Sequence, residues 1–514
     1  MHLQEITQAS DFEKALPQLS WQTIQEAIAS AREDYETVVG LEVHAQLKTA
    51  SKAFASEETT YGQMPNTNIS VVTLAHPGVL PRVNKKVFNY ALRLGLACES
   101  EITRENVFAR KNYFYPDLPK GYQITQDKTP ICVGGKVYIQ PKGATEEKAI
   151  RLVRIHLEED AGKSMHIEGE RDSFIDLNRA GVPLIEIVSE PDIRQVEEAY
   201  AYLTEIRKLV RYLDICDGNM EEGSLRCDVN VSIRKKGVET FGTRVEVKNL
   251  NSFSNVKRAM VFEFERQLYY ALRGWTFIQE TRTFDAPAGK TYALRSKESM
   301  NDYRYFPEPD LTPVIVDEHW IAQVQEKMPP LPRELYLKFT KEYSLSPYDA
   351  EVLTAEKETA LYFEEVCQFT KNYKAAANWV SVNVKGYLNE LMLTIDDFPI
   401  VPEKIAALIN LIDAGKINHN IASKKVYPAL LATPNKTALQ IVQEENLLLE
   451  DNTEELQTLI QTTLAQFPDK VAAYRGGKKG LQGMFMGEIM KKTKGKADAK
   501  LVSKMLQEAL NQSE

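Results

Sequence analysis

The sequence lacks the features of membrane, secreted and disulfide-bonded proteins. No apolar run approaches the roughly 20 residues that a membrane-spanning helix needs. The first residues have no apolar core for a signal peptide and are too acidic for a transit peptide, with Glu5, Asp11, Glu13 and Glu26. The 5 cysteines are odd in number and widely scattered, so neither a disulfide framework nor a CxxC zinc site is expected. We expect a cytoplasmic protein with no membrane partner.

The chain also lacks a positive net charge and the common phosphate-binding loops. Its net charge is −9, so any contact with nucleic acid must be local. Gly162-Lys163-Ser164 and Gly289-Lys290-Thr291 resemble the end of a P-loop, which needs another glycine five residues earlier. Those positions hold Leu157 and Phe284, and no GxGxxG segment is present. If the protein uses ATP, it binds the nucleotide in another way.

Length and composition indicate a globular protein of several domains. The 514 residues are too many for one hydrophobic core, so about two to four domains are expected. A hydrophobic content of 43% and a charged content of 26% are ordinary. We predict a leader of unreadable role at 1–35, an α+β domain at 36–315, a helical domain at 316–438 and a tail domain at 439–514. The best helical segment of the leader runs from Ser20 to Arg32.

Alternation of apolar and polar residues predicts strands with one open face. From Thr37, Leu41, Val43 and Ala45 alternate with a polar set, Glu42, His44 and Gln46. The same pattern recurs in 225–234 and, after a Lys-Lys-Gly turn, in 244–248, which predicts a β-hairpin in an antiparallel sheet. Its polar positions are Arg226, Asp228, Asn230, Glu246 and Lys248. So many ionisable groups on one face indicate a ligand between them.

Two further segments concentrate carboxylates. His156–Lys163 places Glu158, Glu159 and Asp160 around one small turn. Crowded carboxylates repel one another unless a cation such as Mg²⁺ neutralises them, although a solvated loop is the alternative interpretation. Glu186 interrupts the apolar strand Leu184–Val188 and needs a partner, for which a structural salt bridge and a metal ion are equal alternatives.

The remaining segments predict one rigid loop and many helices. Phe108–Lys120 combines aromatic rings, two prolines and three cations, which is typical of a rigid loop. One helix is expected from Ser189 to about Leu213 and another from Asn255 to Leu272. After the prolines at 329–332 the pattern is helical, at 332–343, 355–369, 375–391, 402–414 and 422–431.

The tail carries a local basic patch. Between Arg475 and Lys504 there are nine lysines and arginines against two acids, Glu488 and Asp498. In an acidic protein this patch is a candidate contact with a phosphate backbone. A merely solvated tail is the alternative, and composition gives both equal weight.

Seven motifs in order resemble one known family. They are Gly40–His44, Arg110–Asp117, His156–Lys163, Asp176–Arg179 with Pro183–Asp192, Met220–Asp228, Val247–Ser252 and Asp302–Asp310. From about residue 36 to the C-terminus the chain resembles the B subunits of the aspartyl/glutamyl-tRNA(Asn/Gln) amidotransferases. The resemblance implies an α+β fold with an antiparallel-sheet cradle distantly similar to glutamine synthetase, then an all-α domain. A small helical tail domain of the YqeY type, which helps to hold tRNA, completes the implied layout.

The resemblance also implies a reaction and partners. The family uses ATP and Mg²⁺ to phosphorylate the side-chain carboxylate of Glu or Asp misacylated on tRNA(Gln) or tRNA(Asn), and ammonia then gives the amide. No cluster in this chain reads as an amidase nucleophile with its base, so the resemblance implies a heterotrimer with a glutaminase (A) subunit and a small (C) subunit. The misacylating synthetase is a further candidate partner. The sequence does not distinguish between Glu-tRNA, Asp-tRNA and both as substrates.

Site residues carry over from the resemblance position by position. Metal ligands are expected at Glu42, His44, Glu159 and Glu186. Lys111 and Arg226 are candidate phosphate clamps, while Glu158 is a weaker candidate that could serve ammonia transfer. A further metal or nucleotide shell is expected at Glu221, Glu222 and Asp228, and Asn249 and Asn251 are candidates for orienting substrate. The tRNA contacts are expected at Arg475, Lys478, Lys479, Lys491, Lys492 and Lys494.

The chain departs from the family pattern in one region. Many members carry a four-cysteine zinc site after the first strand, but residues 52–81 contain no cysteine, so no zinc is expected. Two other functions remain as alternatives: a non-catalytic RNA-binding scaffold and a stand-alone ATP-dependent carboxylate–amine ligase.

Overall fold

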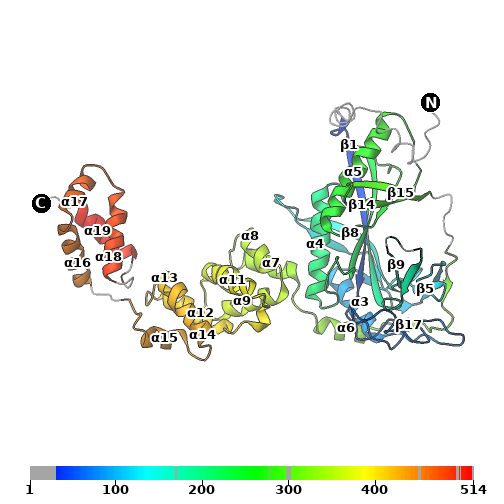
Figure 1. Cartoon of the computed structure of the whole chain (residues 1–514), viewed down its shortest axis with the longest axis horizontal. Coiled ribbons are helices and arrows are strands. Elements are labelled where there is room, and N and C mark those ends of the chain that lie inside the picture. Colours follow the sequence, from blue (N-terminus) through cyan, green and yellow to red (C-terminus); the bar gives the residue numbers. More distant parts are fainter. Residues whose placement is uncertain are drawn as a thin grey trace. The chain divides into compact units, whose positions relative to one another are not determined.

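The computed structural model describes residues 31–167, 169, 171–276, 278–296, 303–449, 453–493, 497 and 499–511. The chain forms two compact units, residues 1–331 and 332–514 (Figure 1). Each unit is described by itself. The predicted leader helix from Ser20 to Arg32 lies almost wholly outside the described residues.

A large, mainly antiparallel sheet organises the first unit. In the described part of the chain it has 13 strands, and its main path runs β15-β14-β13-β12-β1-β11-β8-β5-β4-β16. Only β13 and β14 pair in parallel along this path. The path strands are β1 (Tyr35–Gln46), β4 (Ala109–Asn112), β5 (Tyr122–Thr125), β8 (Lys148–Glu159), β11 (Pro183–Ser189), β12 (Leu225–Lys235), β13 (Val245–Lys248), β14 (Glu280–Asp285), β15 (Lys290–Ser296) and β16 (Phe306–Pro307).

The smaller strands pair beside this path or apart from it. β2 (Glu101–Ile102) pairs with β6 (Cys132–Val133), and β6 and β7 (Lys136–Ile139) both pair with β8. Two separate ribbons join β9 (Lys163–His166) to β10 (Ser173–Asp176) and β3 (Glu105–Asn106) to β17 (Val314–Ile315).

One face of the sheet forms the hydrophobic core. From Val39 onward, the odd-numbered residues of β1, among them Leu41, Val43 and Ala45, are fully buried at 0% exposure. Helices α3 (Lys85–Ala97), α4 (Val196–Tyr212) and α5 (Phe253–Leu272) contribute to the same core cluster, and Figure 1 shows α4 and α5 along one side of the sheet. Burying these apolar faces is the main favourable contribution to folding. The polar residues of the strands therefore point to the opposite face.

The predicted strands and helices of the site region are confirmed in position. β1 covers the predicted alternating segment, and β12 and β13 form the predicted hairpin with Val229 opposite Val247. β11 is the predicted strand around Glu186, and α5 ends at Leu272 as expected. The P-loop-like segments continue into strands β9 and β15, whereas a P-loop lysine opens a helix.

Two predicted boundaries were wrong. The segment 108–120 is not only a loop, because Ala109–Asn112 forms β4 and pairs with β5. Helix α4 begins at Val196 rather than at Ser189, because Ile193 first pairs with Val39 of β1 and the Asp192 carboxylate accepts hydrogen bonds from Arg151.

A buried lysine ties down the long connection after β1. The Lys52 side chain is 0% exposed, and its Nζ donates to the Asn68 carbonyl at 2.7 Å and to Thr73 Oγ1 at 3.4 Å. Burial lowers the pKa of Lys52 to about 8, although Glu57 and Glu159 partly oppose this effect. The Lys52 side chain thus stabilises part of the segment 52–81, for which no zinc site is expected.

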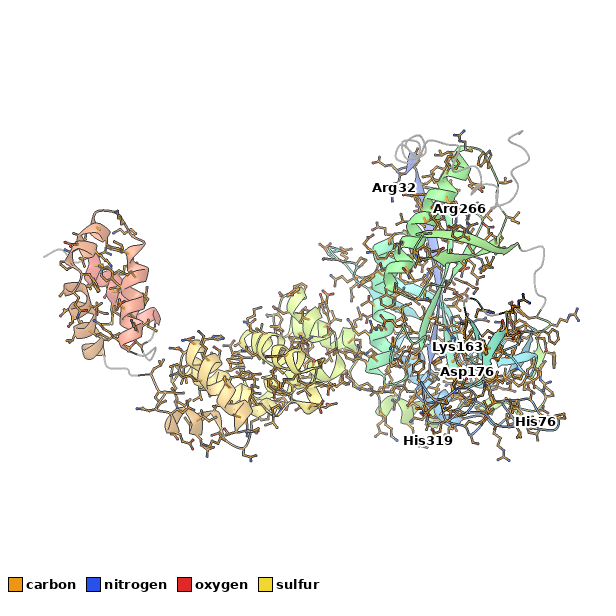
Figure 2. All side chains as sticks on the ribbon, in the orientation of Figure 1. Arg32, His76, Lys163, Asp176, Arg266 and His319 are labelled. Atoms are coloured by element: carbon orange, nitrogen blue, oxygen red, sulfur yellow. The ribbon has the colours of Figure 1, made fainter. Side chains whose placement is uncertain are left out.

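A second buried polar network joins α5 to β14. Arg266 Nη2 lies 2.8 Å from Glu263 Oε2 and 3.3 Å from Glu280 Oε1, and Arg282 Nη1 lies 3.0 Å from the same Glu280 oxygen. All four residues are at most 4% exposed. Figure 2 marks Arg266 on α5. The four charges satisfy one another, which lets charged side chains sit inside the first unit.

The second unit is helical throughout its described part. A short helix of the first unit, α6 (Glu318–Glu326), comes before the second unit in the sequence. Its Ile321 and Val324 belong to the hydrophobic core of the first unit. The helical segments are α7 (Pro332–Lys341), α8 (Pro347–Leu353), α9 (Lys357–Phe369), α10 (Tyr373–Asn378), η3 (Trp379–Val384), α11 (Lys385–Leu391), η4 (Ile395–Asp397), α12 (Pro402–Asp413), α13 (His419–Ile421), η5 (Ala422–Val426), α14 (Tyr427–Ala432), α15 (Ala438–Glu444), α16 (Thr453–Ala465), α17 (Pro468–Arg475), α18 (Leu481–Lys492) and α19 (Ala499–Asn511).

The last four helices have a core of their own. Phe485, Ile489, Val502, Leu506 and Leu510 are fully buried within it. The predicted domain boundaries at 315 and 438 stay predictions, and α15 spans the second. In the described part of the chain, no helix is both long and apolar enough to cross a membrane. The expected cytoplasmic location stays a prediction.

Candidate functional site

Strand register aligns four polar residues across the open face of the sheet. His44 of β1 lies directly opposite Arg226 of β12 on one side and Glu186 of β11 on the other. Glu186 in turn lies opposite His156 of β8. Because facing residues of paired strands share a face, the four side chains form one row on the face away from the core.

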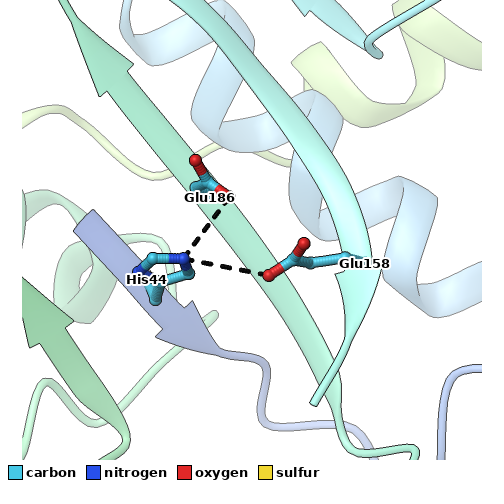
Figure 3. A group of neighbouring side chains, drawn as sticks. All are labelled: His44, Glu158 and Glu186. Carbon is cyan, nitrogen blue, oxygen red and sulfur yellow. Dashed lines mark ion pairs between the residues drawn. The ribbon is translucent and has the colours of Figure 1, made fainter. Parts of the chain in front are cut away.

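Two residues of this row, His44 and Glu186, converge with Glu158 into a group that could hold a metal ion. His44 Nε2 lies 3.4 Å from Glu186 Oε2 and 3.9 Å from Glu158 Oε1 (Figure 3). One candidate ligand atom from each residue lies within 4.8 Å of the others. Glu158 belongs to the next level of the sheet, where it faces Leu184 of β11. Two carboxylates and one imidazole are an oxygen-rich set with a single nitrogen.

His156 supports this group from the far side. Its Nε2 lies 3.3 Å from Glu186 Oε2 and 3.8 Å from Glu158 Oε2. The side chain is 3% exposed, and its Nδ1 is buried without a hydrogen-bond partner among the described residues. Glu186 therefore sits between two imidazoles.

The charges of this group shift its pKa values in opposite directions. Burial alone would lower the pKa of His44, but the hydrogen bond and the charge of Glu186, with the charges of Glu158 and Asp228, raise it to about 9. Burial would raise the pKa of Glu186, yet the hydrogen bonds and charges of His156 and His44 hold it well below its usual range. The Glu186 carboxylate is therefore kept ionised between the imidazoles of His44 and His156.

A second acidic group lies beside the first on the same face. Glu42, Asp228 and Glu246 bring three carboxylates together from β1, β12 and β13. Lys248 Nζ contacts Asp228 Oδ2 at 2.5 Å and Glu246 Oε1 at 2.9 Å, and Asn230 donates to Glu42 at 2.8 Å. Burial, followed by the charges of Glu186 and Glu246, raises the pKa of Glu42. Lys248 already neutralises part of the charge of this group. In the described part of the chain, the carboxylates of the first group form their ion pairs with His44 and His156 and not with a lysine.

The two predicted clamps, Arg226 and Lys111, lie on either side of the His44–Glu158–Glu186 group in the strand order. Arg226 Nη2 lies 2.9 Å from Asp160 Oδ2, and Gln46 donates to the same oxygen at 2.7 Å. Burial would raise the pKa of Asp160, but Arg226 and Arg179 lower it. Asp160 thus fixes the guanidinium beside His44.

Lys111 reaches the group from the other edge. It lies opposite Gln123 of β5, and two residues further along β5 the Thr125 hydroxyl donates to Glu158 Oε2 at 3.5 Å. Burial would lower the pKa of Lys111, but Glu158, with smaller effects from Tyr305 and Glu186, raises it. Lys111 is therefore a cation on the same face of the sheet as Glu158, and it stays charged because of the nearby carboxylates.

Glu159 does not join the group that the sequence analysis expected. It follows Glu158 in β8, so it points to the other face of the sheet. There it pairs with Lys120 and accepts the Ile124 amide at 2.9 Å. Glu158, which the sequence analysis ranked below it, takes the place beside His44 and Glu186. The predicted metal role of Glu159 has no support from this geometry.

The other predicted residues lie at strand ends. Glu221 and Glu222 are exposed in the turn before β12, where their amides donate to Asn219 Oδ1 at 3.0 and 3.4 Å. Asn249 and Asn251 are exposed just after β13, and Asn249 donates to the Phe284 carbonyl at 3.2 Å. The candidate ligand groups among the described residues include none of these four.

The predicted tRNA contacts that the structure describes lie on α17 and α18 or in the turn between them. Lys478, Lys479 and Lys491 are exposed, and Lys479 Nζ lies 4.2 Å above the Tyr474 ring. Lys492 donates to Gln466 at 2.9 Å, and Arg475 donates to the Leu510 carbonyl at 3.2 Å. Lys494 lies outside the described residues.

Asp160, Glu246 and Lys248 were noted among the charged positions of the sequence, but neither they nor His156 had a predicted role at the site. Alternation along 148–159 would have found His156, because it shares a face with Glu158. Asp160 lies just beyond the end of β8, where alternation no longer applies, and the sequence carried no sign of its contact with Arg226.

Comparison with known proteins decides the family. The family model of the GatB/GatE catalytic domain matches residues 37–322, and that of the GatB domain matches residues 361–510. The B subunit of the aspartyl/glutamyl-tRNA(Asn/Gln) amidotransferase of Pelodictyon phaeoclathratiforme is 49% identical over 472 residues, which cover 92% of this chain and 98% of the relative. The chain belongs to this family of B subunits.

Other B subunits match equally far. Those of Chlorobium luteolum and Alkalilimnicola ehrlichii are each 48% identical, over 476 and 479 residues. These matches cover 93% of this chain and 99% and 100% of the relatives. Membership of the B-subunit family, which the seven motifs predicted, is confirmed.

Proposed function

We propose that this chain activates and amidates the side-chain carboxylate of Glu or Asp misacylated on tRNA. A carboxylate oxygen attacks the terminal phosphorus of ATP, ADP leaves, and an acyl phosphate forms. Ammonia then attacks the acyl carbon, phosphate leaves, and one proton is lost to give the neutral amide. The family resemblance implies this sequence of steps, and the relatives' names refer to the same class of reaction.

The observation that carries the proposal is the His44–Glu158–Glu186 group flanked by Lys111 and Arg226. Two carboxylates and an imidazole converge within 4.8 Å, and this donor set fits Mg²⁺, which prefers oxygen ligands. We propose that these three residues hold the ion. When bound, Mg²⁺ neutralises and polarises the transferring phosphoryl group.

The chain's own cations complete the electrostatics. Lys111 and Arg226 enter the open face from opposite edges, so both can neutralise negative charge that develops between them. Asp160, to which Gln46 also donates, orients the Arg226 guanidinium before any substrate binds. Asp228, Glu221 and Glu222 are proposed for nucleotide binding, and Asn249 and Asn251 for substrate orientation, with less geometric support.

We propose that ammonia comes from partner proteins. Burial raises the pKa of Cys98, Cys216 and Cys367 to about 12, so none of these thiols is a ready nucleophile at neutral pH. A glutaminase (A) subunit, joined by a small (C) subunit in a heterotrimer, would supply the ammonia, and the misacylating synthetase is a further candidate partner. The similarity of the sheet domain to glutamine synthetase and of the tail to YqeY stays a prediction.

Reconstitution tests the proposal and separates it from the alternatives. The complex of this chain with its partners is incubated with ATP, Mg²⁺, glutamine and tRNA carrying either Glu or Asp. We expect ADP release that depends on the misacylated tRNA, and formation of Gln-tRNA, Asn-tRNA or both. Tight tRNA binding without ADP release would support the scaffold instead, and ADP release driven by free glutamate or aspartate would support the stand-alone ligase.

A further inference from the structure

Four tyrosines from two distant segments form a continuous row beside Lys111. The ring centroids of Tyr115 and Tyr113 lie 5.8 Å apart, those of Tyr113 and Tyr303 6.1 Å, and those of Tyr303 and Tyr305 5.9 Å. Lys111 Nζ lies 5.0 Å above the Tyr303 ring. We call these four residues the tyrosine row.

The backbone that carries the row is held firmly. The Asn112 amide donates to the Tyr303 carbonyl at 3.0 Å, and its side chain donates to the Arg304 carbonyl at 2.9 Å. Arg110 and Glu308 form two parallel hydrogen bonds of 2.7 and 2.8 Å, with Glu308 buried. Bidentate pairs of this kind fix geometry as well as adding energy. The row is therefore arranged before any ligand arrives.

The row nevertheless exposes aromatic surface. Tyr115 is 53% exposed and Tyr305 is 41% exposed, and the neighbouring Phe114 and Phe306 are 89% and 45% exposed. Clustered exposed apolar groups on a folded domain commonly mark a binding surface. Aromatic rings interleaved with cations are the composition of sites that bind single-stranded nucleic acid, because a base stacks on a ring while a cation contacts its phosphate.

The position of the row limits what it can bind. Lys111 Nζ contacts the Tyr303 ring, and the pairing of β4 with β5 and of β5 with β8 puts Lys111 on the same face of the sheet as Glu158. In an aminoacylated tRNA, the amino acid is esterified to the last nucleotide. That nucleotide must therefore lie next to the group that receives the side-chain carboxylate.

We propose that the tyrosine row stacks the unpaired bases at the 3′ end of the aminoacylated tRNA. This inference rests on the proposed function and adds a binding surface to it. Stacking on rings is tolerant of base identity and requires no deformation of the protein. The row then holds the ester-linked amino acid so that its side chain reaches Lys111.

A fluorescent base reports the stacking directly. The reconstituted complex is titrated with uncharged tRNA whose terminal adenosine is replaced by 2-aminopurine, a base whose emission falls on stacking. We expect strong quenching with wild type and with Tyr303→Phe, and loss of quenching at saturating tRNA with Tyr303→Leu and Tyr115→Leu. Tyr348→Leu, which removes a 73% exposed ring of α8, is the control and should quench like wild type. Unchanged quenching in both row variants would overturn the inference.

Kinetics provide a second, independent arm. Loss of one stacking partner should raise the KM for the aminoacylated tRNA by about 5- to 100-fold and leave the KM for ATP unchanged. A raised KM for ATP with an unchanged KM for tRNA would assign the row to the adenine of ATP and overturn the inference. Because quenching needs no chemistry, a wild-type complex that quenches without releasing ADP would contradict the proposed function and leave the stacking supported. Tyr115→Leu changes only an exposed side chain, so the test survives if Tyr303→Leu fails to fold.

Discussion

Two adjacent glutamates, Glu158 and Glu159, show that a shift of one position along a strand changes the face and the contacts of a side chain. Glu158 and Glu159 are both nearly fully buried, at 4% and 3% exposure. Glu158 faces His44 on the open side, whereas Glu159 faces Lys120 on the other. Identical side chains therefore have different tasks, because consecutive residues of a strand point to opposite faces.

The matched pair Glu158→Gln and Glu159→Gln tests this difference. Glu158→Gln should lower kcat for amidation at least about 100-fold, because it removes a charge from the proposed metal-ligand group. Glu159→Gln should instead lower the free energy of unfolding by about 2–3 kcal/mol, because it weakens a buried ion pair. Steady-state kinetics and thermal unfolding of both variants give the answer. Equal loss of activity with unchanged unfolding in Glu159→Gln would restore its place as a ligand.

Lys52 predicts a pH dependence whose sign follows from its burial. The pKa of Lys52 is about 8 in the folded chain, against the ordinary value of 10.5. Between these values the unfolded chain binds more protons than the folded chain, so the contribution of Lys52 to stability rises with pH. Wild type should thus gain thermal stability relative to Lys52→Met between pH 7.5 and pH 9.5. A constant difference in melting temperature across this range would exclude a depressed pKa.

At the scale of elements, the sequence predicted the strands with a long alternating pattern. It did not predict a short strand or a contact between residues far apart in the chain. Alternation over ten or so residues located β1 and the β12–β13 hairpin, because a period of two is visible along the chain. Strand β4 has only four residues and sits between aromatic and proline-rich segments, so its pattern was too short to recognise. The contact between Asp160 and Arg226 joins residues far apart in the sequence, and no local pattern encodes it.

The group of His44, Glu158 and Glu186 also depends on contacts between residues far apart in the sequence. Each polar face was predicted strand by strand, but their relative register depends on the pairing of β1 with both β11 and β12. Which of the adjacent residues Glu158 and Glu159 meets Glu186 and His44 depends in addition on the pairing of β8 with β11. The family and the site region were therefore predictable, whereas the choice between the two glutamates needed the structure.

The ion network between α5 and β14 carries a prediction about stability. Glu263→Leu should lower the free energy of unfolding by about 3–5 kcal/mol, because it leaves Arg266 and Arg282 buried with too little negative charge. Chemical denaturation measures the change. Glu265→Leu, on the half-buried side of the same helix, is a matched control and should cost much less. Equal losses would mean that the network contributes little beyond packing.

For the molecule as a whole, the tail lysines should set the salt dependence of tRNA binding. Lys478→Ala with Lys479→Ala should weaken binding and reduce the slope of log K against log salt by about 2, or about one for each lost phosphate contact. Binding measured from low to moderate salt gives the slope. Lys327→Ala with Lys341→Ala removes the same charge elsewhere and should leave the slope unchanged. An unchanged slope in the tail variant would count against the basic patch.

The division of labour within the complex is also testable. The chain alone should release no ammonia from glutamine, because the buried thiols with raised pKa values offer no activated nucleophile. Addition of the glutaminase partner should restore release, and an enzyme-coupled ammonia assay measures both. Robust glutaminase activity of the chain alone would contradict this division of labour.

The central position of β1 has a consequence for synthesis of the protein. β1 is translated first of the path strands, yet its two neighbours, β11 and β12, emerge from the ribosome only later. At ordinary elongation rates roughly ten seconds pass before β11 follows. Both edges of β1 stay unpaired during this interval, and an unpaired strand edge is a site at which chains can aggregate. Fragments that end before β12 lack Arg226, so they cannot form the row of four polar residues across the sheet.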